Sequence, residues 1–264
     1  MASRKIEERG RPKYSAPALE KGLDILELLS LQSEPMSLAQ IGQKLGRTSG
    51  EIFRMLAALE RRGYLARGPR PEQYQLTNML FELAHRHPPV KRLLVNALPI
   101  MEELARSIQQ SCHLAVRHEN DALIVAQVDC PGFTGFSVRV GAHAPLVDSC
   151  SGRVLLAFQS PERRAVWLST AMAHAAIPTP RSALEASLQE IRQAGVNRQP
   201  SRIHHGIVDF GMPILDHEGH ALAVLTVPSL ANIESQLGEA ELVQQLGLHA
   251  RQLTEKLGSP VVQP

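Results

Sequence analysis

Apolar residues between positions 15 and 65 recur at the spacing of α-helices. The first helix, over residues 15–31, should face its neighbours through Leu19, Leu23, Leu26 and Ser30. A second, short helix starts at Ser37, where Gln40 completes a capping-box pattern, and ends at Gly46. A third helix begins at Thr48 or Ser49, and its apolar stripe is Ile52, Phe53, Leu56 and Leu59. The pattern therefore predicts three helices joined by tight turns.

The third helix, from Ser49 to Arg62, presents a polar and partly basic outer face. The outward residues are Ser49, Gly50, Glu51, Arg54, Ala57 and Arg61. Two short helices at this spacing are typical of a helix-turn-helix, whose second helix enters the major groove of DNA. Helix pairs with an apolar seam are also common in domains that bind no DNA, so the pattern alone leaves both interpretations open.

The segment that follows, residues 64–77 (YLARGPRPEQYQLT), predicts two short strands around a Gly/Pro-rich tip. Such a hairpin is typical of a wing, and Arg67 and Arg70 near its tip are placed to contact phosphates or the minor groove. An ordinary solvated hairpin would carry similar charges. A wing directly after the helix pair nevertheless favours the DNA-binding interpretation.

The run from Ala18 to Tyr64 resembles the winged-helix domain of the IclR family of bacterial transcription regulators. The segments that carry the resemblance are ALEKGLDILELL, LAQIGQKLG and LAALERRGYL, and the resemblance continues over nearly the whole chain. It implies double-stranded operator DNA as a partner, a small-molecule effector, and assembly as a homodimer or a homotetramer.

Within this domain we expect the residues that contact DNA to divide into two groups. Ser49, Glu51 and Arg54 are the candidates for reading base edges, while Arg47, Thr48, Arg67 and Arg70 should mainly hold phosphates. One winged helix offers few base contacts, so specificity requires at least a dimer that reads two half-sites.

The second half of the chain predicts an α+β domain built on an antiparallel sheet. Residues 91–264 contain a long helix, a strand pair, further helices, a second strand pair and a closing helix from about Gly238 to Leu257. We expect residues 1–14 to be a disordered basic tail, residues 15–77 the winged helix-turn-helix domain, and residues 78–90 a helical linker ended by Pro88 and Pro89. Residues 91–264 would form the effector-binding and oligomerisation domain.

Two segments of this second domain, GAHAPLVDSCSGRVLLAF and HGIVDFGMPILD with GHALAVLTVP, look like the GAF-like effector domain of the same family. A loop of small residues, 148–152, precedes an expected helix over 153–158, whose positive end favours an anion. By resemblance, the pocket also includes a loop at 133–136, the strand at Asp209 and the strand end at 226–229. The expected ligand-binding residues are Phe133, Phe136, Asp148, Ser149, Cys150, Ser151, Gly152, Asp209, Thr226 and Pro228. A capped helix without a ligand is the alternative.

The chain departs from the commoner family pattern in residues that bear on the effector. Arg202, His204 and His205 precede Gly206, where many relatives carry carboxylates, and Asp209 stands where several have a small or neutral residue. A buried acid favours an amine or hydroxyl, and basic neighbours favour an acid. We therefore expect an organic acid or an amino-acid-like metabolite.

Composition fits a soluble, globular protein, with 44% hydrophobic and 20% charged residues. Residues 1–87 hold 14 Lys/Arg against 10 Asp/Glu, and residues 88–264 hold 14 against 16, so the net charge of +2 is concentrated in the N-terminal part. The three cysteines form no CxxC pair, which predicts a reducing, cytoplasmic location. The sequence contains no signal peptide and no apolar run long enough to span a membrane.

Other classes of function have weaker support. Cys150 with His204 or His205 and Asp209 has the residue types of a nucleophile, a base and an orienting acid, but in no recognised pattern. A metal site from His204, His205, Asp209, His217 and His220 is conceivable, whereas His85 and His87 point to different faces of one helix. Nucleotide-binding motifs are absent, so we expect no cofactor, no metal and no catalysis. A small-molecule binding protein whose winged helix contacts proteins is the remaining alternative.

Overall fold

A computed structural model describes residues 16–133, 135–175, 177–202, 204–230 and 237–258 of the chain. The expected tail at residues 1–14 lies outside these residues. The chain divides into two compact units, residues 1–88 and 89–264, each of which is described by itself. Among the helices of the described residues, none is both long and apolar enough to cross a membrane.

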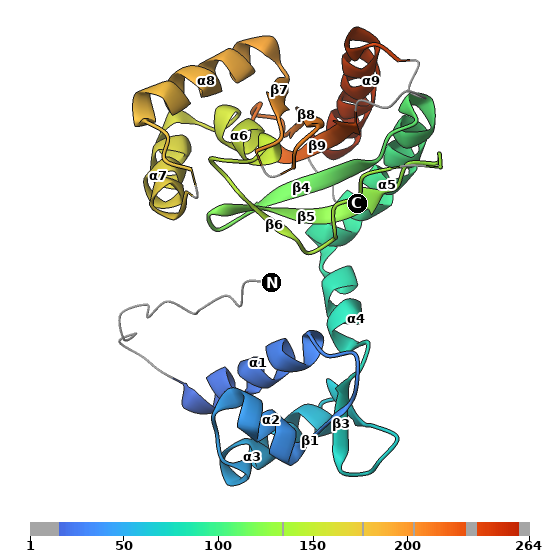
Figure 1. Cartoon of the computed structure of the whole chain (residues 1–264), viewed down its shortest axis with the longest axis vertical. Helices are drawn as coiled ribbons and strands as arrows, with labels where there is room; N and C mark the ends of the chain where they lie inside the picture. Colours follow the sequence, from blue (N-terminus) through green and yellow to red (C-terminus); the bar gives the residue numbers. More distant parts are fainter. Residues whose placement is uncertain (1–15, 134, 176, 203, 231–236, 259–264) are drawn as a thin grey trace. The chain divides into compact units, whose positions relative to one another are not determined.

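The first unit is a winged helix (Figure 1). Its helices are α1 (Pro17–Ser30), α2 (Leu38–Leu45), α3 (Ser49–Arg61) and α4 (Met79–Arg86). Its strands β1 (Met36–Ser37), β2 (Leu65–Arg67) and β3 (Gln73–Leu76) form an antiparallel sheet in the order β1-β3-β2. The two-residue strand β1 was not expected from the sequence.

Local signals in the sequence account for the ends of the helix-turn-helix. Ser37 accepts a hydrogen bond from the Gln40 amide, and the Gln40 side chain accepts one from the Ser37 amide, as the capping-box pattern predicts. Gly46 ends α2 with φ at 64°, a conformation that glycine adopts without strain. Of the two candidate caps for α3, Thr48 is the N-cap and Ser49 is the first helical residue.

Two assignments of apolar residues to the core were wrong. In α1, Ile25 and Leu29 are buried, whereas Leu19 is 63% and Leu23 is 48% exposed. Both faces of α1 are apolar, so the spacing alone did not distinguish the face that packs inward. Phe53 of α3 is 53% exposed, because its neighbour Ile52 fills the core and adjacent helical residues point about 100° apart.

The second unit is an antiparallel sheet of six strands in the order β6-β5-β4-β9-β8-β7. The strands are β4 (Cys112–His118), β5 (Asp121–Val128), β6 (His143–Pro145), β7 (Asn197–Pro200), β8 (Ile207–Leu215) and β9 (Ala221–Leu230). The helices are α5 (Pro88–Ile108), α6 (Cys150–Ala157), α7 (Pro161–Ala171), α8 (Arg181–Ala194) and α9 (Glu239–Gly258), with a short 3-10 turn at Met172–His174.

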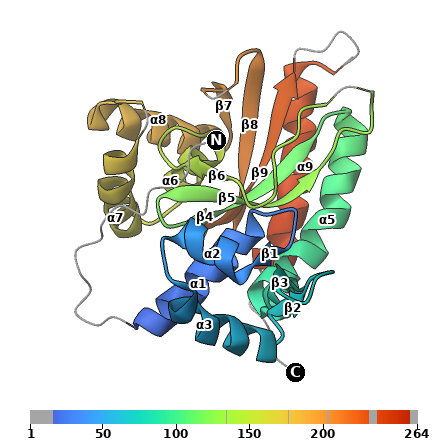
Figure 2. The ribbon, with the colours of Figure 1, turned by 60° about the horizontal axis from the view of Figure 1, so that its bottom comes forward.

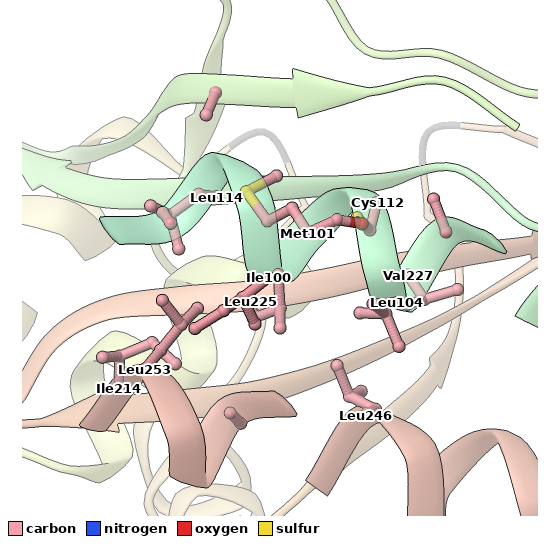
Figure 3. Packing of buried hydrophobic residues seen from close by; sticks show 14 of the residues in the cluster. Ile100, Met101, Leu104, Cys112, Leu114, Ile214, Leu225, Val227, Leu246 and Leu253 are labelled. Carbon is pink, nitrogen blue, oxygen red and sulfur yellow. The ribbon is translucent and has the colours of Figure 1, made fainter. Parts of the chain in front are cut away.

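Helices lie on both faces of this sheet, with α5 and α9 on one side and α6, α7 and α8 on the other (Figures 1 and 2). Because successive side chains of a strand point to opposite faces, the core forms two clusters, one on each side of the sheet. Cys112 and Leu114 of β4 pack against Met101 of α5 and Leu246 of α9 (Figure 3), while Ala115 joins the cluster beneath α6. His113 points to the α6 side, where the pocket described below is located.

Two helix boundaries and one strand differ from the expectation. Helix α4 ends at Arg86, and Pro88 and Pro89 belong to the first turn of α5, where a missing amide hydrogen is tolerated. Helix α6 begins at Cys150 instead of 153, so Cys150, Ser151 and Gly152 are its first turn rather than part of a loop. The four-residue strand β7 was missed.

Candidate DNA-binding surface and effector pocket

Helix α3 presents Ser49 and Arg54 to solvent on the face that the sequence assigned to DNA. Among the described residues, Arg54 has no hydrogen bond or ion pair, so its guanidinium is available for an external acceptor. The exposed Phe53 lies beside it. Its ring, which the sequence interpretation had placed in the core, can contact an apolar base edge such as a thymine methyl group.

Glu51 is instead engaged within the unit. Its Oε2 atom accepts hydrogen bonds of 2.9 Å from the amide and from the hydroxyl of Thr48, and its Oε1 atom lies 3.1 Å from Nζ of Lys21 in α1. These hydrogen bonds, first of all the one from the Thr48 amide, lower the pKa of Glu51 to about 2. The geometry therefore makes Glu51 a residue that fixes the start of α3.

The three arginines that were expected to hold phosphates also differ in whether they have a partner within the unit. Arg67 forms a bidentate pair with Glu60 at 2.7 and 2.9 Å, donates to the Pro71 carbonyl, and stacks over the ring of Tyr74. Arg70 at the tip is exposed and has no such partner among the described residues. Arg47, in the turn between the helices, lies 3.3 Å from the Asp24 carboxylate. Of these three arginines, Arg70 is the one whose charge is fully available to a phosphate.

In the second unit, a small cavity of about 80 Å³ lies at the start of α6 on the sheet. The lining residues come from the sheet, from the first turn of α6, and from the segments at 136–144 and 201–204. They are His113, Ile124, Phe136, Val138, Ala144, Ser149, Cys150, Ser151, Ser201, His204, Asp209, Thr226 and Pro228. Polar groups therefore line one part of the cavity and apolar groups another, as is typical of a small-molecule site.

The floor of the cavity is a hydrogen-bonded group that joins α6 to the two central strands. His113 of β4 pairs in register with Thr226 of β9. Ser151 of α6 lies above them, with its hydroxyl oxygen 2.8 Å from Oγ1 of Thr226 and 3.3 Å from Nε2 of His113.

Two glycines allow α6 to approach so closely. A Cβ atom on Gly152 would lie 2.4 Å from the backbone of Leu146, and one on Gly211 would lie 3.0 Å from the Cys150 sulfur. A side chain at either position would therefore push the first turn of α6 away from its neighbours.

Burial shifts the pKa of three ionisable groups that line the pocket. It lowers the pKa of His113 to about 4, and it raises the pKa of the Cys150 thiol well above its usual range, with the nearby Asp209 carboxylate adding to the effect. Burial also raises the pKa of Asp209, against the opposing effects of a hydrogen bond from Ser201 and of His204. At neutral pH His113 and Cys150 are neutral, and the half-buried Asp209 is the acid of the site.

The basic residues near the pocket are directed elsewhere. Arg153 of α6 donates through Nε to the Val147 carbonyl at 2.9 Å, and its Nη1 is 3.4 Å from the Ser187 hydroxyl. Arg202 lies 3.7 Å from the carboxylate of Asp148. Among the described residues that line the cavity there is no lysine or arginine.

The structure brings most of the expected ligand-binding residues to this one cavity. They are Phe136, Ser149, Cys150, Ser151, Asp209, Thr226 and Pro228. Phe133 is instead fully exposed, Asp148 is buried beside Arg202, and Gly152 packs against Leu146. His113 was missed, because a single histidine in an alternating strand gives no signal that it lines a pocket.

The residues of the enzyme and metal alternatives have a different arrangement. A catalytic cysteine needs a lowered pKa, whereas the pKa of Cys150 is raised, and His205 does not line the cavity. Across the described residues, the cluster with metal-ligand spacing is Asp216, Glu218 and His220 in the turn between β8 and β9. It shares only His220 with the metal site that the sequence made conceivable.

Comparison with known proteins gives matches to two family models. Residues 18–69 match the IclR helix-turn-helix domain, and residues 90–255 match the C-terminal domain of the bacterial transcriptional regulator IclR. A DNA-binding transcriptional repressor of Escherichia coli, YiaJ, is 23% identical over 97% of this chain and 92% of its own. The glycerol operon regulatory protein of Streptomyces coelicolor is 28% identical over 87% of this chain and 90% of its own.

Solved structures give the same result. An IclR homologue from Microbacterium hydrocarbonoxydans, crystallised in complex with 4-hydroxybenzoate, is 26% identical. It superposes with a TM-score of 0.75 over 91% of this chain and 98% of that chain. IclR of Thermotoga maritima, at 20% identity and a TM-score of 0.73, shares the fold.

Proposed function

The chain belongs to the IclR family of bacterial transcriptional regulators, and from this premise we propose which of its residues bind DNA and which bind the effector. As a member it is a ligand-responsive regulator with a helix-turn-helix DNA-binding domain. The observation that carries the proposal is the cavity at the start of α6, which lies in the domain that the family uses to bind effectors. The protein would act in the cytoplasm, where operator DNA is found.

The DNA-binding surface is the outer face of α3 together with the wing. Arg54 and Ser49 would read base edges in the major groove, and Arg70 would hold a phosphate. Four other expected contact residues act by fixing the turn, the start of α3 and the wing, because each already has a partner within the unit: Arg47, Thr48, Glu51 and Arg67. This assignment moves these four residues to a positioning role.

The effector would be a small organic acid that carries a second polar group. The Ser149 hydroxyl caps the Gly152 amide, whereas the amides of Cys150 and Ser151 in the same turn favour a carboxylate. Asp209 and the hydroxyls of Ser151 and Thr226 suit a hydrogen-bonding group. The 4-hydroxybenzoate of the Microbacterium protein has both kinds of group. It is therefore a reasonable first probe for this chain.

Effector binding would change operator affinity through the helices between Asn78 and Ser111, which connect the two domains along the chain. The change can be no larger than the difference in effector affinity between the DNA-bound and DNA-free arrangements. Because one winged helix reads few bases, we expect the regulator to bind as a dimer or as a pair of dimers.

The test is binding of the purified protein to the intergenic DNA beside its own gene, at two salt concentrations, against a random duplex of equal length. Arg54→Ala should weaken binding to the specific duplex by roughly 1–3 kcal/mol, because a base contact is lost. Arg67→Ala is the matched control, since its guanidinium is paired with Glu60 and should contribute less. An equal loss for Arg54→Ala on both duplexes would make it a phosphate contact.

The same experiment also tests the alternative function, a small-molecule binding protein whose winged helix contacts other proteins. If binding is weak, equal on both duplexes and unchanged by 4-hydroxybenzoate, the winged helix serves protein contacts rather than operator recognition. Specific binding whose logarithm falls linearly with the logarithm of salt concentration supports the regulator.

A further inference from the structure

Asp209 is the ionisable acid inside the effector pocket, and its surroundings can be followed element by element. On β8, Asp209 pairs in register with Gln199 of β7 and Pro228 of β9, neither of which is charged. The segment after β7 contributes Ser201, whose hydroxyl bonds the carboxylate, and His204 near the mouth of the pocket.

Apart from His204, the other titratable groups around the pocket place no cation beside this acid. Helix α6 contributes the neutral thiol of Cys150, and β4 contributes the neutral imidazole of His113. The guanidinium of Arg153 is bonded to Val147 and Ser187, and Arg202 pairs with Asp148. Each nearby arginine is therefore directed away from the cavity or towards another acid.

We propose that Asp209 selects the effector by accepting a hydrogen bond, so that the group it meets is a hydroxyl or an amine and not a second carboxylate. This inference rests on the proposed function, in which the cavity is the effector site. It goes further by naming which chemical groups of the effector can face Asp209. A carboxylate facing Asp209 would lie in a cavity lined by no compensating arginine or lysine, and apart from the neutral His113 the one basic side chain among the described lining residues is His204.

The selection has a definite dependence on pH. A dicarboxylate can enter only when Asp209 is protonated, so its affinity should rise as the pH falls through the pKa of Asp209 and decrease by up to tenfold per pH unit above it. A neutral hydroxyl needs no proton, so its affinity should change little over the same range. Burial raises the pKa of Asp209, which moves this dependence towards the physiological range.

The experiment uses the full-length protein and three probes on one scaffold: 4-hydroxybenzoate, 4-aminobenzoate and benzene-1,4-dicarboxylate. Each keeps one carboxylate for the start of α6 and changes only the opposite group. Dissociation constants are measured by calorimetry between pH 5 and 8 for the wild type, for Asp209→Asn and for Asp209→Lys. Glu241→Gln, an exposed acid on α9, is the control.

The wild type and Glu241→Gln should bind the hydroxyl and amine probes at least tenfold more tightly than the dicarboxylate at pH 8. Asp209→Asn should remove the pH dependence for the dicarboxylate, and Asp209→Lys should reverse the order of affinities. Equal binding of all three probes by the wild type, or an order unchanged in Asp209→Lys, would overturn the inference while leaving the pocket as the effector site.

Binding of no probe by the wild type would overturn the inference together with the pocket as a site for acids of this kind. Operator binding, measured separately as described above, would be unaffected by that outcome. Circular dichroism of each variant establishes that it is folded, and Asp209→Ser provides a second neutral replacement if Asp209→Asn does not fold.

Discussion

At the scale of single residues, the site depends on positions that have no functional group. Gly152 carries no side chain, yet the backbone of Leu146 occupies the place where its Cβ would be. This contact lets the first turn of α6 approach the segment before it, and it places Ser151 within hydrogen-bonding distance of Thr226. The pocket floor therefore depends on a glycine as much as on its polar residues.

Gly152→Ala should destabilise the effector domain, although alanine is the better helix former by about 1 kcal/mol. A Cβ atom 2.4 Å from backbone atoms cannot be accommodated without moving α6, and overpacking of this kind costs about 1–3 kcal/mol. Urea unfolding, followed by the fluorescence of Trp167, measures the effect.

Gly247→Ala in α9 is the matched control for this substitution. A Cβ there would meet only the ends of the Met212 and Arg251 side chains at 3.5 Å, which is ordinary van der Waals contact. This variant should be as stable as the wild type or more so. A Gly152→Ala protein with unchanged stability would show that the close approach of α6 is dispensable.

At the scale of elements, the sequence was most informative where structure is set by neighbours along the chain. Ser37 with Gln40 marked the start of α2 because a capping box involves residues three apart, whereas the same pattern of Thr48 with Glu51 at the start of α3 was not recognised. Strands β1 and β7 were missed because two or four residues have no measurable alternation. Strand β1 pairs with β3, which is distant in sequence, and β7 pairs with the next strand along the chain, β8.

The contrast between local signals and contacts made only in the fold also explains which pocket residues the sequence could predict. Ser149 to Ser151 were found because small residues before a helix are a local signal, and Asp209 came from the family resemblance. His113 reaches the pocket only through its pairing with Thr226, 113 positions further along the chain, so a single sequence could not reveal it. The directions of Arg153 and Arg202 likewise depend on partners that only the fold brings near.

The capping of α3 leads to a prediction about the winged helix and pH. The pKa of Glu51 is lowered to about 2 from 4.5, so its contribution to stability is present above about pH 4.5 and is lost as the pH falls towards 2. Glu51→Gln should lower the melting temperature of this unit at pH 6, and the difference from the wild type should vanish near pH 2.

Melting followed by far-UV circular dichroism measures this difference, while the fluorescence of Trp167 follows the effector domain separately. Glu72→Gln, in the exposed wing tip, is the control and should melt like the wild type at every pH. If Glu51→Gln and the wild type differ equally at pH 6 and pH 2, the side chain acts by something other than its charge.

At the scale of the whole molecule, the winged-helix unit has an apolar groove that its own described residues leave open. A groove of about 470 Å³ is lined by residues of α1, α3 and α4. They include Leu19, Leu23, Met55, Leu59, Leu80 and Leu83. Among the described residues of α4 none is buried, and an eight-residue helix is not stable in water without packing. A second copy of the chain would supply that packing, and it would bring a second α3 for the other half-site.

Leu83→Asp should therefore reduce self-association, because it places a charge on a surface that the expected dimer would bury. Val166→Asp is the matched control, since Val166 is 64% exposed on α7 and lies far along the chain from the groove. Sedimentation should show a lower average mass for Leu83→Asp, and its operator affinity should fall towards that of a single half-site. The control should keep both properties. A Leu83→Asp protein with unchanged mass and unchanged operator affinity would mean that the two copies meet through another surface, and that the exposed leucines of α1 and α4 have a different partner.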